Sequence, residues 1–81
     1  MFYTYVLKSL SYETLYIGSS EKPVERLKNE HNKGIIKYTK GRLPWIIIHE
    51  ESFLTRSEAM KREKFLKSGQ GRKFLKEVLG N

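Results

Sequence analysis

The sequence predicts a small α+β domain in which a three-stranded, mainly antiparallel sheet is flanked by helices. Three observations support this prediction. Aromatic and β-branched segments open the chain, a short apolar segment returns at residues 45–48, and helical patterns follow the sheet segments. The chain has 81 residues, which suits one domain with a modest core. The expected order is β-β-α-β-α-α within a single domain, residues 1–81.

The first half of the chain reads as a hairpin followed by a helix. Residues 2–8 form the first predicted strand, residues 9–14 a polar connection, and residues 15–17 a second strand that ends at Gly18. Ser20 is the expected N-cap of the helix, because serine side chains accept hydrogen bonds from the first turn. Pro23 is tolerated in that turn. The helix is expected to reach about residue 32 and to stop near Gly34.

The second half contains a loop, a strand and two helices. Gly34, Gly41 and Pro44 predict a loop over residues 33–44. The continuous apolar run at residues 45–48 is typical of a central strand that is covered on both faces. Thr55 and Glu58 have the spacing of a capping box, which predicts a helix over residues 56–67. A last short helix is expected over residues 72–79.

The composition excludes several kinds of site. There is no cysteine, so the chain has no disulfide, thiolate nucleophile or thiolate metal ligand. Two histidines, His31 and His49, argue against a tetrahedral zinc site, and His49 reads as structural. No apolar run approaches the ~20 residues of a membrane span, and the N-terminus lacks the pattern of a signal peptide. These absences predict a soluble cytoplasmic protein without a membrane partner.

The charge indicates a polyanionic partner. Sixteen Lys and Arg residues against nine acidic residues give a net charge of +7. Basic residues gather in the loop over residues 33–44 and again over residues 56–76, where only Glu58 and Glu63 oppose them. Clustering of this kind is expected for a protein that binds nucleic acid. A merely solvated basic surface is the alternative explanation.

Glu63 stands out because it falls within an apolar stripe. At about 100° per residue, Glu63 projects roughly 40° from Ala59 and roughly 60° from Met60 and Leu66. A buried carboxylate without a partner is unfavourable, so such a group is normally paired, protonated or bound to a metal. A structural ion pair with a neighbouring Lys or Arg is one interpretation, and a functional site is the other.

Several motifs resemble those of the GIY-YIG nuclease family, of the small stand-alone type. The matching positions have the family's order and spacing: the tyrosine of the first motif, the intact second motif, an arginine on the first helix and a later Arg-Glu pair, namely Tyr5, Tyr16-Ile17-Gly18, Arg26 and Arg62-Glu63. The first motif is otherwise altered, because the chain has Tyr3-Thr4-Tyr5 in place of Gly-Ile-Tyr.

The resemblance implies hydrolysis of DNA phosphodiester bonds with one divalent cation, Mg²⁺ or Mn²⁺. It makes Glu63 the metal ligand and places Arg26 on a phosphate, where a guanidinium fork can stabilise developing charge. It also implies that Tyr5 or Tyr16 orients or deprotonates the attacking water. A tyrosine is a poor base at neutral pH unless cations stabilise its phenolate. Which tyrosine is the base stays open.

Three further positions carry weaker implications. The missing side chain of Gly18 would let a substrate backbone approach, or the glycine simply ends a strand. Ser19 stands where some relatives place a lysine. The family commonly has a His or Tyr four residues after the arginine, but here Glu30 takes that place and His31 follows one residue later. That offset turns His31 by about 100° on a regular helix unless the helix bulges.

The basic loop and the Arg-Glu pair are the expected nucleic-acid contacts, through Lys37, Lys40, Arg42 and Arg62. Without a second domain for base recognition, structure-selective or weakly sequence-specific cleavage is expected. A monomer or weak dimer is the expected state, and delivery by a protein partner stays open. The alternative function is a nucleic-acid-binding module that keeps the nuclease fold but has little or no activity.

Overall fold

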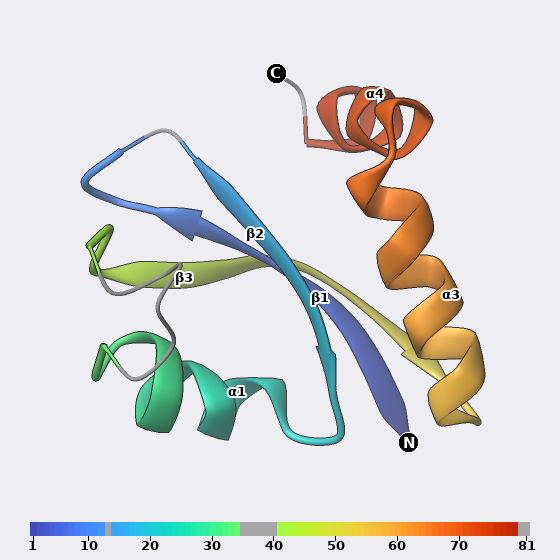
Figure 1. Ribbon diagram of the computed structural model, residues 1–81, viewed down its shortest axis with the longest axis horizontal. Helices are drawn as coiled ribbons and strands as arrows, with labels where there is room; N and C mark the ends of the chain where they lie inside the picture. The colour runs from blue at the N-terminus through green and yellow to red at the C-terminus, as the bar shows by residue number, and fades with distance from the viewer. Residues whose placement is uncertain (13, 35–40, 80–81) are drawn as a thin grey trace.

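The computed structural model describes residues 1–12, 14–34 and 41–79, and it confirms the predicted α+β architecture. Three antiparallel strands lie in the order β2-β1-β3: β1 (Phe2–Ser9), β2 (Leu15–Ser20) and β3 (Trp45–Phe53). Helix α1 (Pro23–Arg26) continues into the π-helical turn η1 (Leu27–His31). Helices α3 (Arg56–Lys67) and α4 (Gly69–Val78) follow β3 (Figure 1). The predicted hairpin is therefore β1 and β2.

Strand β3 lies at an edge of the sheet, so the prediction of a central strand over residues 45–48 is wrong. Ile46 is 41% exposed. A β-bulge interrupts the pairing with β1, because Leu7 pairs with Ile47 whereas Val6 pairs with the residue two positions further, which leaves Ile48 as an extra residue. The run is apolar because both faces of the sheet are covered, and Ile47 and Ile48 pack into different hydrophobic clusters.

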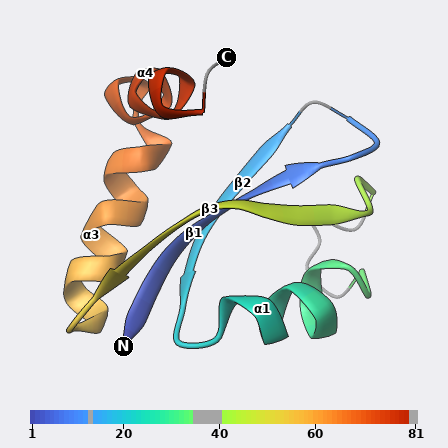
Figure 2. The same cartoon turned by 180° about the vertical axis from the view of Figure 1, so that it is seen from behind.

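The two hydrophobic clusters cover opposite faces of the sheet, because successive side chains of β1 point to opposite sides. The cluster beneath α3 and α4 is built around Val6, Ile17, Leu66 and Leu75. The cluster on the side of η1 is built around Tyr5, Leu7 and Trp45. Figure 2 shows this division, with α1 on one side of the sheet and α3 on the other. Tyr5 is thus a core residue on the η1 side.

The helix boundaries depart from the prediction at two points. Ser20 is the last residue of β2 and not a helix cap. The N-cap of α1 is Lys22, which makes no side-chain capping bond, and its N–H donates to Ser20 Oγ at 3.0 Å. Helix α4 begins at Gly69, earlier than expected, because Ser68 both ends α3 and accepts a hydrogen bond from Gly71 N–H. The predicted cap of α3 by Thr55 is confirmed.

Helix α3 is fixed to the sheet by two contacts. Thr4 on β1 donates its hydroxyl to the Ala59 carbonyl at 2.6 Å, and both residues are buried. Arg62 forms a two-pronged ion pair with Glu51 on β3, at 2.7 and 3.2 Å. These contacts set the rotation of α3 and therefore the direction in which the next residue, Glu63, projects. Within the described ranges, no helix has the length and apolar character that a membrane span requires.

Candidate active site

Two tyrosines and a histidine from three elements meet on the η1 side of the sheet. Tyr5 Oη on β1 lies 3.0 Å from His31 Nε2 on η1, which is a buried hydrogen bond. The Tyr16 ring on β2 lies against the His31 ring, with centroids 4.7 Å apart, and the Trp45 ring lies edge-on to the Tyr16 ring, with centroids 6.5 Å apart. Tyr5 and His31 are fully buried, whereas Tyr16 is half-buried. Tyr16 is therefore the more accessible of the two phenols.

The register of the hairpin explains why both tyrosines fit beside one histidine. Tyr5 pairs with Gly18, and Tyr16 precedes Gly18 by two residues on the same face of β2. A Cβ atom on Gly18 would lie 2.7 Å from Tyr5 Oη and 3.1 Å from a ring carbon of Tyr16. Glycine is needed here because the Tyr5 phenol occupies the space that a side chain would fill. In this packing the space next to Gly18 belongs to Tyr5 and is not open to a substrate.

A π-helical turn brings His31 to this cluster. Asn32 N–H donates to the Leu27 carbonyl at 2.9 Å, which is the five-residue spacing of a π-helix. The extra residue in the turn compensates for the one-residue offset between His31 and the family pattern. His31 therefore faces Tyr5, while Glu30 pairs with Arg26 at 3.1 Å. The sequence alone did not decide whether the first helix contains a bulge, and the structure shows one at η1.

Burial keeps the Tyr5–His31 pair neutral. Desolvation raises the pKa of Tyr5 well above its ordinary value, although the Arg26 charge opposes this rise. Desolvation, followed by the Arg26 charge, lowers the pKa of His31 below its ordinary value. The pair at neutral pH is thus a protonated phenol and an uncharged imidazole. A Tyr5 phenolate is strongly disfavoured in this environment.

Arg26 bridges the first helix and the end of β2. Its Nη1 donates to the Ser19 carbonyl at 3.0 Å, and its Nε donates to Glu30 at 3.1 Å. The Arg26 side chain is 33% exposed, and its charge acts on both Tyr5 and His31. The Ser19 backbone, not its hydroxyl, is what holds Arg26. Two contacts leave further N–H donors of the guanidinium available for an anion.

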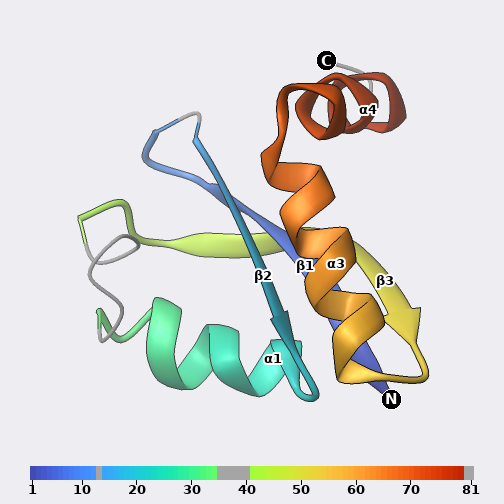
Figure 3. The same cartoon turned by 45° about the vertical axis from the view of Figure 1, so that its right-hand side comes forward.

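Glu63 on α3 approaches the same neighbourhood from the other side of β2. Its negative charge is among the causes that raise the pKa of Tyr5, together with those of Tyr16 and Glu30. Figure 3 shows how the end of β2 lies between α1 and α3, which bring Arg26 and Glu63 respectively. The charges of Arg26 and Glu63 therefore both act on the Tyr5 phenol.

The helical spacing predicted that Glu63 lies within a buried apolar stripe, and this prediction is wrong. Ala59 and Leu66 are buried, but Met60 is 54% exposed, so Glu63 lies at the border of the core with 23% side-chain exposure. Its carboxylate accepts a hydrogen bond from Lys67 Nζ at 2.7 Å. The ion pair with a neighbouring lysine, one of the two interpretations of the sequence, is therefore present. A carboxylate at this border also remains accessible to a cation from solvent.

The donor chemistry around Glu63 fits one hard cation. Among the residues that the structure describes, no three His, Cys, Asp or Glu residues gather as a metal site. Mg²⁺ keeps several waters and is commonly held by one or two carboxylates together with substrate phosphates, so a lone carboxylate suits it. Glu63 already holds a cationic group, the Lys67 ammonium, at hydrogen-bond distance.

The predicted nucleic-acid contacts have different surroundings. Lys37 and Lys40 lie outside the described residues. Arg42 is half-buried, and its backbone carbonyl accepts a hydrogen bond from Ser9. Arg62 is paired with Glu51, and its guanidinium lies over the rings of two phenylalanines on α3 and α4, at 4.9 and 4.8 Å. The fork of Arg62 is thus engaged within the protein.

Sequence reasoning missed three participants. Glu30 and Lys67 each follow a predicted site residue by four positions on a helix, so the i, i+4 rule would have found both ion pairs. Glu51 had no comparable signal, because its partners Arg62 and His49 meet it only in the folded structure. His49, which the sequence predicts to be structural, lies with its Nε2 2.7 Å from Glu51 Oε2. Arg62 and His49 together lower the pKa of Glu51 despite its partial burial.

Comparison with known proteins supports the same assignment. A family model described as the GIY-YIG catalytic domain matches residues 1–75. A UPF0213 protein of Natronomonas pharaonis is 48% identical over 67 residues, covering 82% of this chain and 76% of that protein. A UPF0213 protein of Staphylococcus saprophyticus is 40% identical over 77 residues, covering 94% and 92%.

A UPF0213 protein of Listeria welshimeri is 50% identical over 60 residues, covering 73% of this chain and 64% of that protein. These names state no activity, and no solved structure gives a significant match. The family model spans all four motif positions, from Tyr5 through Glu63. The chain therefore belongs to the GIY-YIG family, whose domains are typically nucleases.

Proposed function

We propose that the protein is a divalent-metal-dependent endonuclease that hydrolyses DNA phosphodiester bonds. The observation that carries the proposal is the cluster on the η1 side of the sheet, in which Tyr5 Oη lies 3.0 Å from His31 Nε2 and the Tyr16 and His31 ring centroids lie 4.7 Å apart. Arg26 is held beside this cluster by the Ser19 carbonyl at 3.0 Å, and the charges of Arg26 and Glu63 both act on Tyr5. A binding module does not require a carboxylate beside a polyanion. A nuclease does, because the carboxylate recruits the cation that lets phosphate approach.

Each residue has a role that follows from its surroundings. Glu63 would hold Mg²⁺ or Mn²⁺, which supplies charge stabilisation for the phosphate in the transition state. Arg26 would bind a non-bridging phosphate oxygen with the N–H donors that Ser19 and Glu30 do not use. Water attacks phosphorus, the bond to the leaving oxygen breaks, and a base near Tyr16 takes the proton of the water.

The two tyrosines divide the work in this proposal. Tyr5 is a positioning residue, because it is buried, stays protonated and holds His31 by a hydrogen bond. Tyr16 is half-buried and packs on the uncharged, fully buried His31 ring, so Tyr16 is the better candidate to contact the attacking water. The raised pKa of Tyr5 favours Tyr16 over Tyr5 for that contact.

The proposed substrate is DNA that is recognised by shape more than by sequence. In this proposal the basic side chains predicted to bind nucleic acid contact its phosphates. Phosphate contacts do not distinguish one base from another. Branched or nicked DNA, as arises in repair, fits this expectation. We also infer that the protein acts in the cytoplasm, as a monomer or weak dimer.

The decisive experiment removes the carboxylate of Glu63. Plasmid, single-stranded and branched DNA are incubated with Mg²⁺ or Mn²⁺, beside an EDTA control, with the wild type and Glu63→Gln. The wild type should nick DNA only with metal, and the variant should lose at least about a hundredfold in rate, as is typical when a preorganised charge is removed. Glu77→Gln, on the exposed part of α4, is the matched control, since it makes the same charge change away from the site.

The same experiment separates the two candidate functions. Wild-type binding without cleavage on all substrates and with both metals would favour the binding module. Cleavage that persists in Glu63→Gln would remove Glu63 from the mechanism. In the proposed mechanism, DNA binding by Glu63→Gln persists or tightens without metal, because a negative charge facing phosphate has been removed.

A further inference from the structure

We propose that the outer face of α3 is a second nucleic-acid surface, along which the DNA backbone runs as it leaves the cleavage site. This inference rests on the proposed function, because it takes DNA to enter at Glu63. An open hollow of about 430 Å³ lies on this face. It is lined by Arg56, Ser57, Met60, Lys61 and Lys64. We call these residues the α3 strip.

The α3 strip adjoins the candidate site directly. At about 100° per residue, Arg56 projects roughly 20° from Glu63, Met60 roughly 60°, and Lys64 roughly 100°, all on the side away from Ala59. Glu63 therefore lies between the buried face of α3 and the strip. A DNA strand that places a phosphate near Glu63 can continue onto the strip without crossing an intervening element.

The cations of the strip are not neutralised by the protein. Within the described residues, Lys61 and Lys64 are exposed and make no ion pair. Arg56 lies over the Phe2 ring at 5.2 Å, a contact that keeps its positive charge. By contrast, the other two cations of α3, Arg62 and Lys67, are each held by a carboxylate. The uncommitted charge of α3 is therefore concentrated on the strip.

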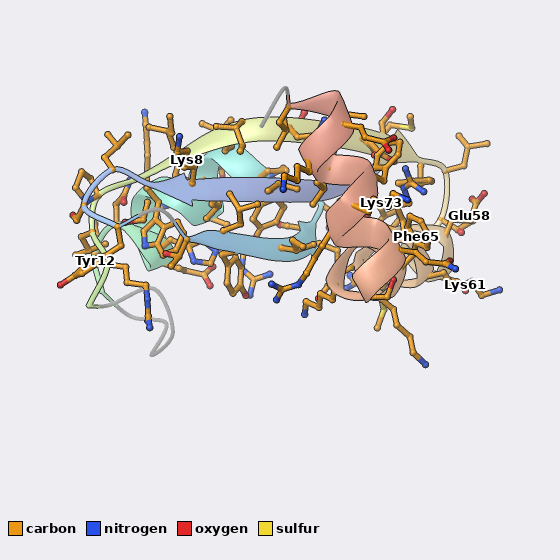
Figure 4. All side chains as sticks on the ribbon, turned by 90° about the horizontal axis from the view of Figure 1, so that it is seen from above. Lys8, Tyr12, Glu58, Lys61, Phe65 and Lys73 are labelled. Carbon is orange, nitrogen blue, oxygen red and sulfur yellow. The ribbon has the colours of Figure 1, made fainter. Side chains whose placement is uncertain are left out.

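Glu58 is an exposed acid of α3 that does not line the hollow. Glu58 accepts a hydrogen bond from the Thr55 hydroxyl at the start of the helix, at 3.0 Å. Figure 4 shows the Lys61 side chain extending outward at the edge of the molecule, near Glu58. Three cations, Arg56, Lys61 and Lys64, outweigh this carboxylate, so net positive charge dominates this face and a polyanion is the occupant with complementary charge.

The apolar part of the strip suits a nucleic-acid backbone as well. Met60 is 54% exposed and lines the hollow together with Lys61 and Lys64, whose methylene stems add apolar surface. Sugar rings alternate with phosphates along a strand, so an apolar floor with a cationic rim complements both. From Arg56 to Glu63 the helix rises about 10 Å, which matches roughly three nucleotides of one strand.

The test uses Lys61→Gln/Lys64→Gln in the Glu63→Gln background, which prevents cleavage during the measurement. Glutamine has nearly the helix propensity of lysine, so α3 should keep its structure. The control is Lys73→Gln/Lys76→Gln on α4, which makes the same charge change on exposed residues. Binding of a labelled duplex is followed by fluorescence anisotropy from about 50 to about 200 mM salt, without metal.

The α3 variant should bind DNA at least about tenfold more weakly than its parent near 0.1 M salt. The negative slope of log K against log salt should become shallower by about 1.8, because two phosphate contacts are lost. The α4 control should keep the slope of its parent. Equal slopes for the α3 variant and its parent would overturn the inference and would leave the hollow to an acidic protein segment. The proposed function fails separately, if the wild-type protein binds DNA through the strip but never cleaves it.

Discussion

The Tyr5–His31 pair shows how a single residue can belong to the core and to the site. Tyr5 is one of the largest fully buried side chains, and its hydroxyl is hydrogen-bonded to an equally buried imidazole. Burial raises the pKa of the phenol and lowers that of the imidazole, so neither group is charged at neutral pH. Tyr5, which the family resemblance offers as a possible base, is therefore better suited to hold His31 in position.

Gly18 provides the sharpest test of this packing. Gly18→Ala would place a methyl group 2.7 Å from Tyr5 Oη and 2.9 Å from the carbon that bears it. Because both rings around Gly18 are packed in the core, we expect a loss of about 1–3 kcal/mol in the free energy of unfolding, typical of overpacking. Urea unfolding followed by Trp45 fluorescence measures this loss.

Gly69→Ala is the control, since nothing lies within 4 Å of the added methyl group. Adding Tyr5→Phe to Gly18→Ala should recover part of the loss, because the nearest clashing atom is then absent. A Gly18→Ala variant as stable as the wild type would show that the Tyr5 ring is not held against this position.

At the scale of the element, the π-helical turn η1 decides which side chain reaches the site. The sequence placed His31 on the first helix but could not fix its direction, since the choice between a hydrogen-bond spacing of four residues and one of five depends on tertiary contacts. Two such contacts fix the end of this helix. The Asn32 side-chain amide donates to the Trp45 carbonyl at 3.1 Å and accepts from the Trp45 N–H at 2.7 Å, and Tyr5 is hydrogen-bonded to His31. The ends of the turn are fixed, and the extra residue bulges between them.

Deletion of the exposed residue Asn29 tests this account. The Asn32 N–H to Leu27 carbonyl bond would then span four residues, as in an α-helix, and His31 would follow Arg26 at the four-residue spacing. We expect the free energy of unfolding to change by less than about 1 kcal/mol, as for a tolerated surface change. The His31 ring resonances in NMR spectra should still report a neutral imidazole.

Deletion of Lys64 is the matched control, because it removes one exposed residue from the regular helix α3. There the deletion would turn Leu66 by about 100° away from the core, and the protein should unfold. If deletion of Asn29 were equally damaging, the bulge would be a required part of the site and not an accommodated insertion.

Other elements show where sequence patterns were sufficient and where they were not. The hairpin and the Thr55 cap depend on local spacing, and both were predicted. The position of β3 was not, because an apolar run of isoleucines looks the same in a central strand and at an edge with a bulge. Only the pairing of β1 with both neighbours, seen at Val6 and Leu7, distinguishes the two.

At the scale of the whole molecule, the site is a meeting of the two halves of the chain across β2. The motif spacing identified Tyr5, Tyr16, Arg26 and Glu63 as candidates, yet spacing carries no information on whether their charges interact. The fold supplies this: Arg26 and Glu63 both act on Tyr5, from α1 and α3. The sequence left open whether Glu63 pairs with a neighbouring cation, and the structure shows that it accepts a hydrogen bond from Lys67.

The Lys67 contact makes the stability of the whole molecule a reporter of the proposed metal site. A ligand that binds only the native state raises the melting temperature, by an amount set by RT ln(1 + [L]/Kd). A cation at Glu63 must displace the Lys67 ammonium, so Lys67→Gln should bind Mn²⁺ more tightly than the wild type. We therefore expect a larger Mn²⁺-induced rise in melting temperature for Lys67→Gln, and no rise for Glu63→Gln, measured by calorimetry without DNA.

Lys73→Gln on α4 makes the same charge change as Lys67→Gln and controls for long-range electrostatics. Its Mn²⁺-induced shift should equal that of the wild type, because screening at physiological salt limits the effect of distant exposed charges. The lost ion pair itself should cost Lys67→Gln less than about 1 kcal/mol, since the lysine side chain is 54% exposed. A shift in Lys67→Gln no larger than that in Lys73→Gln would mean that the ammonium and the metal do not compete, and that the cation binds elsewhere.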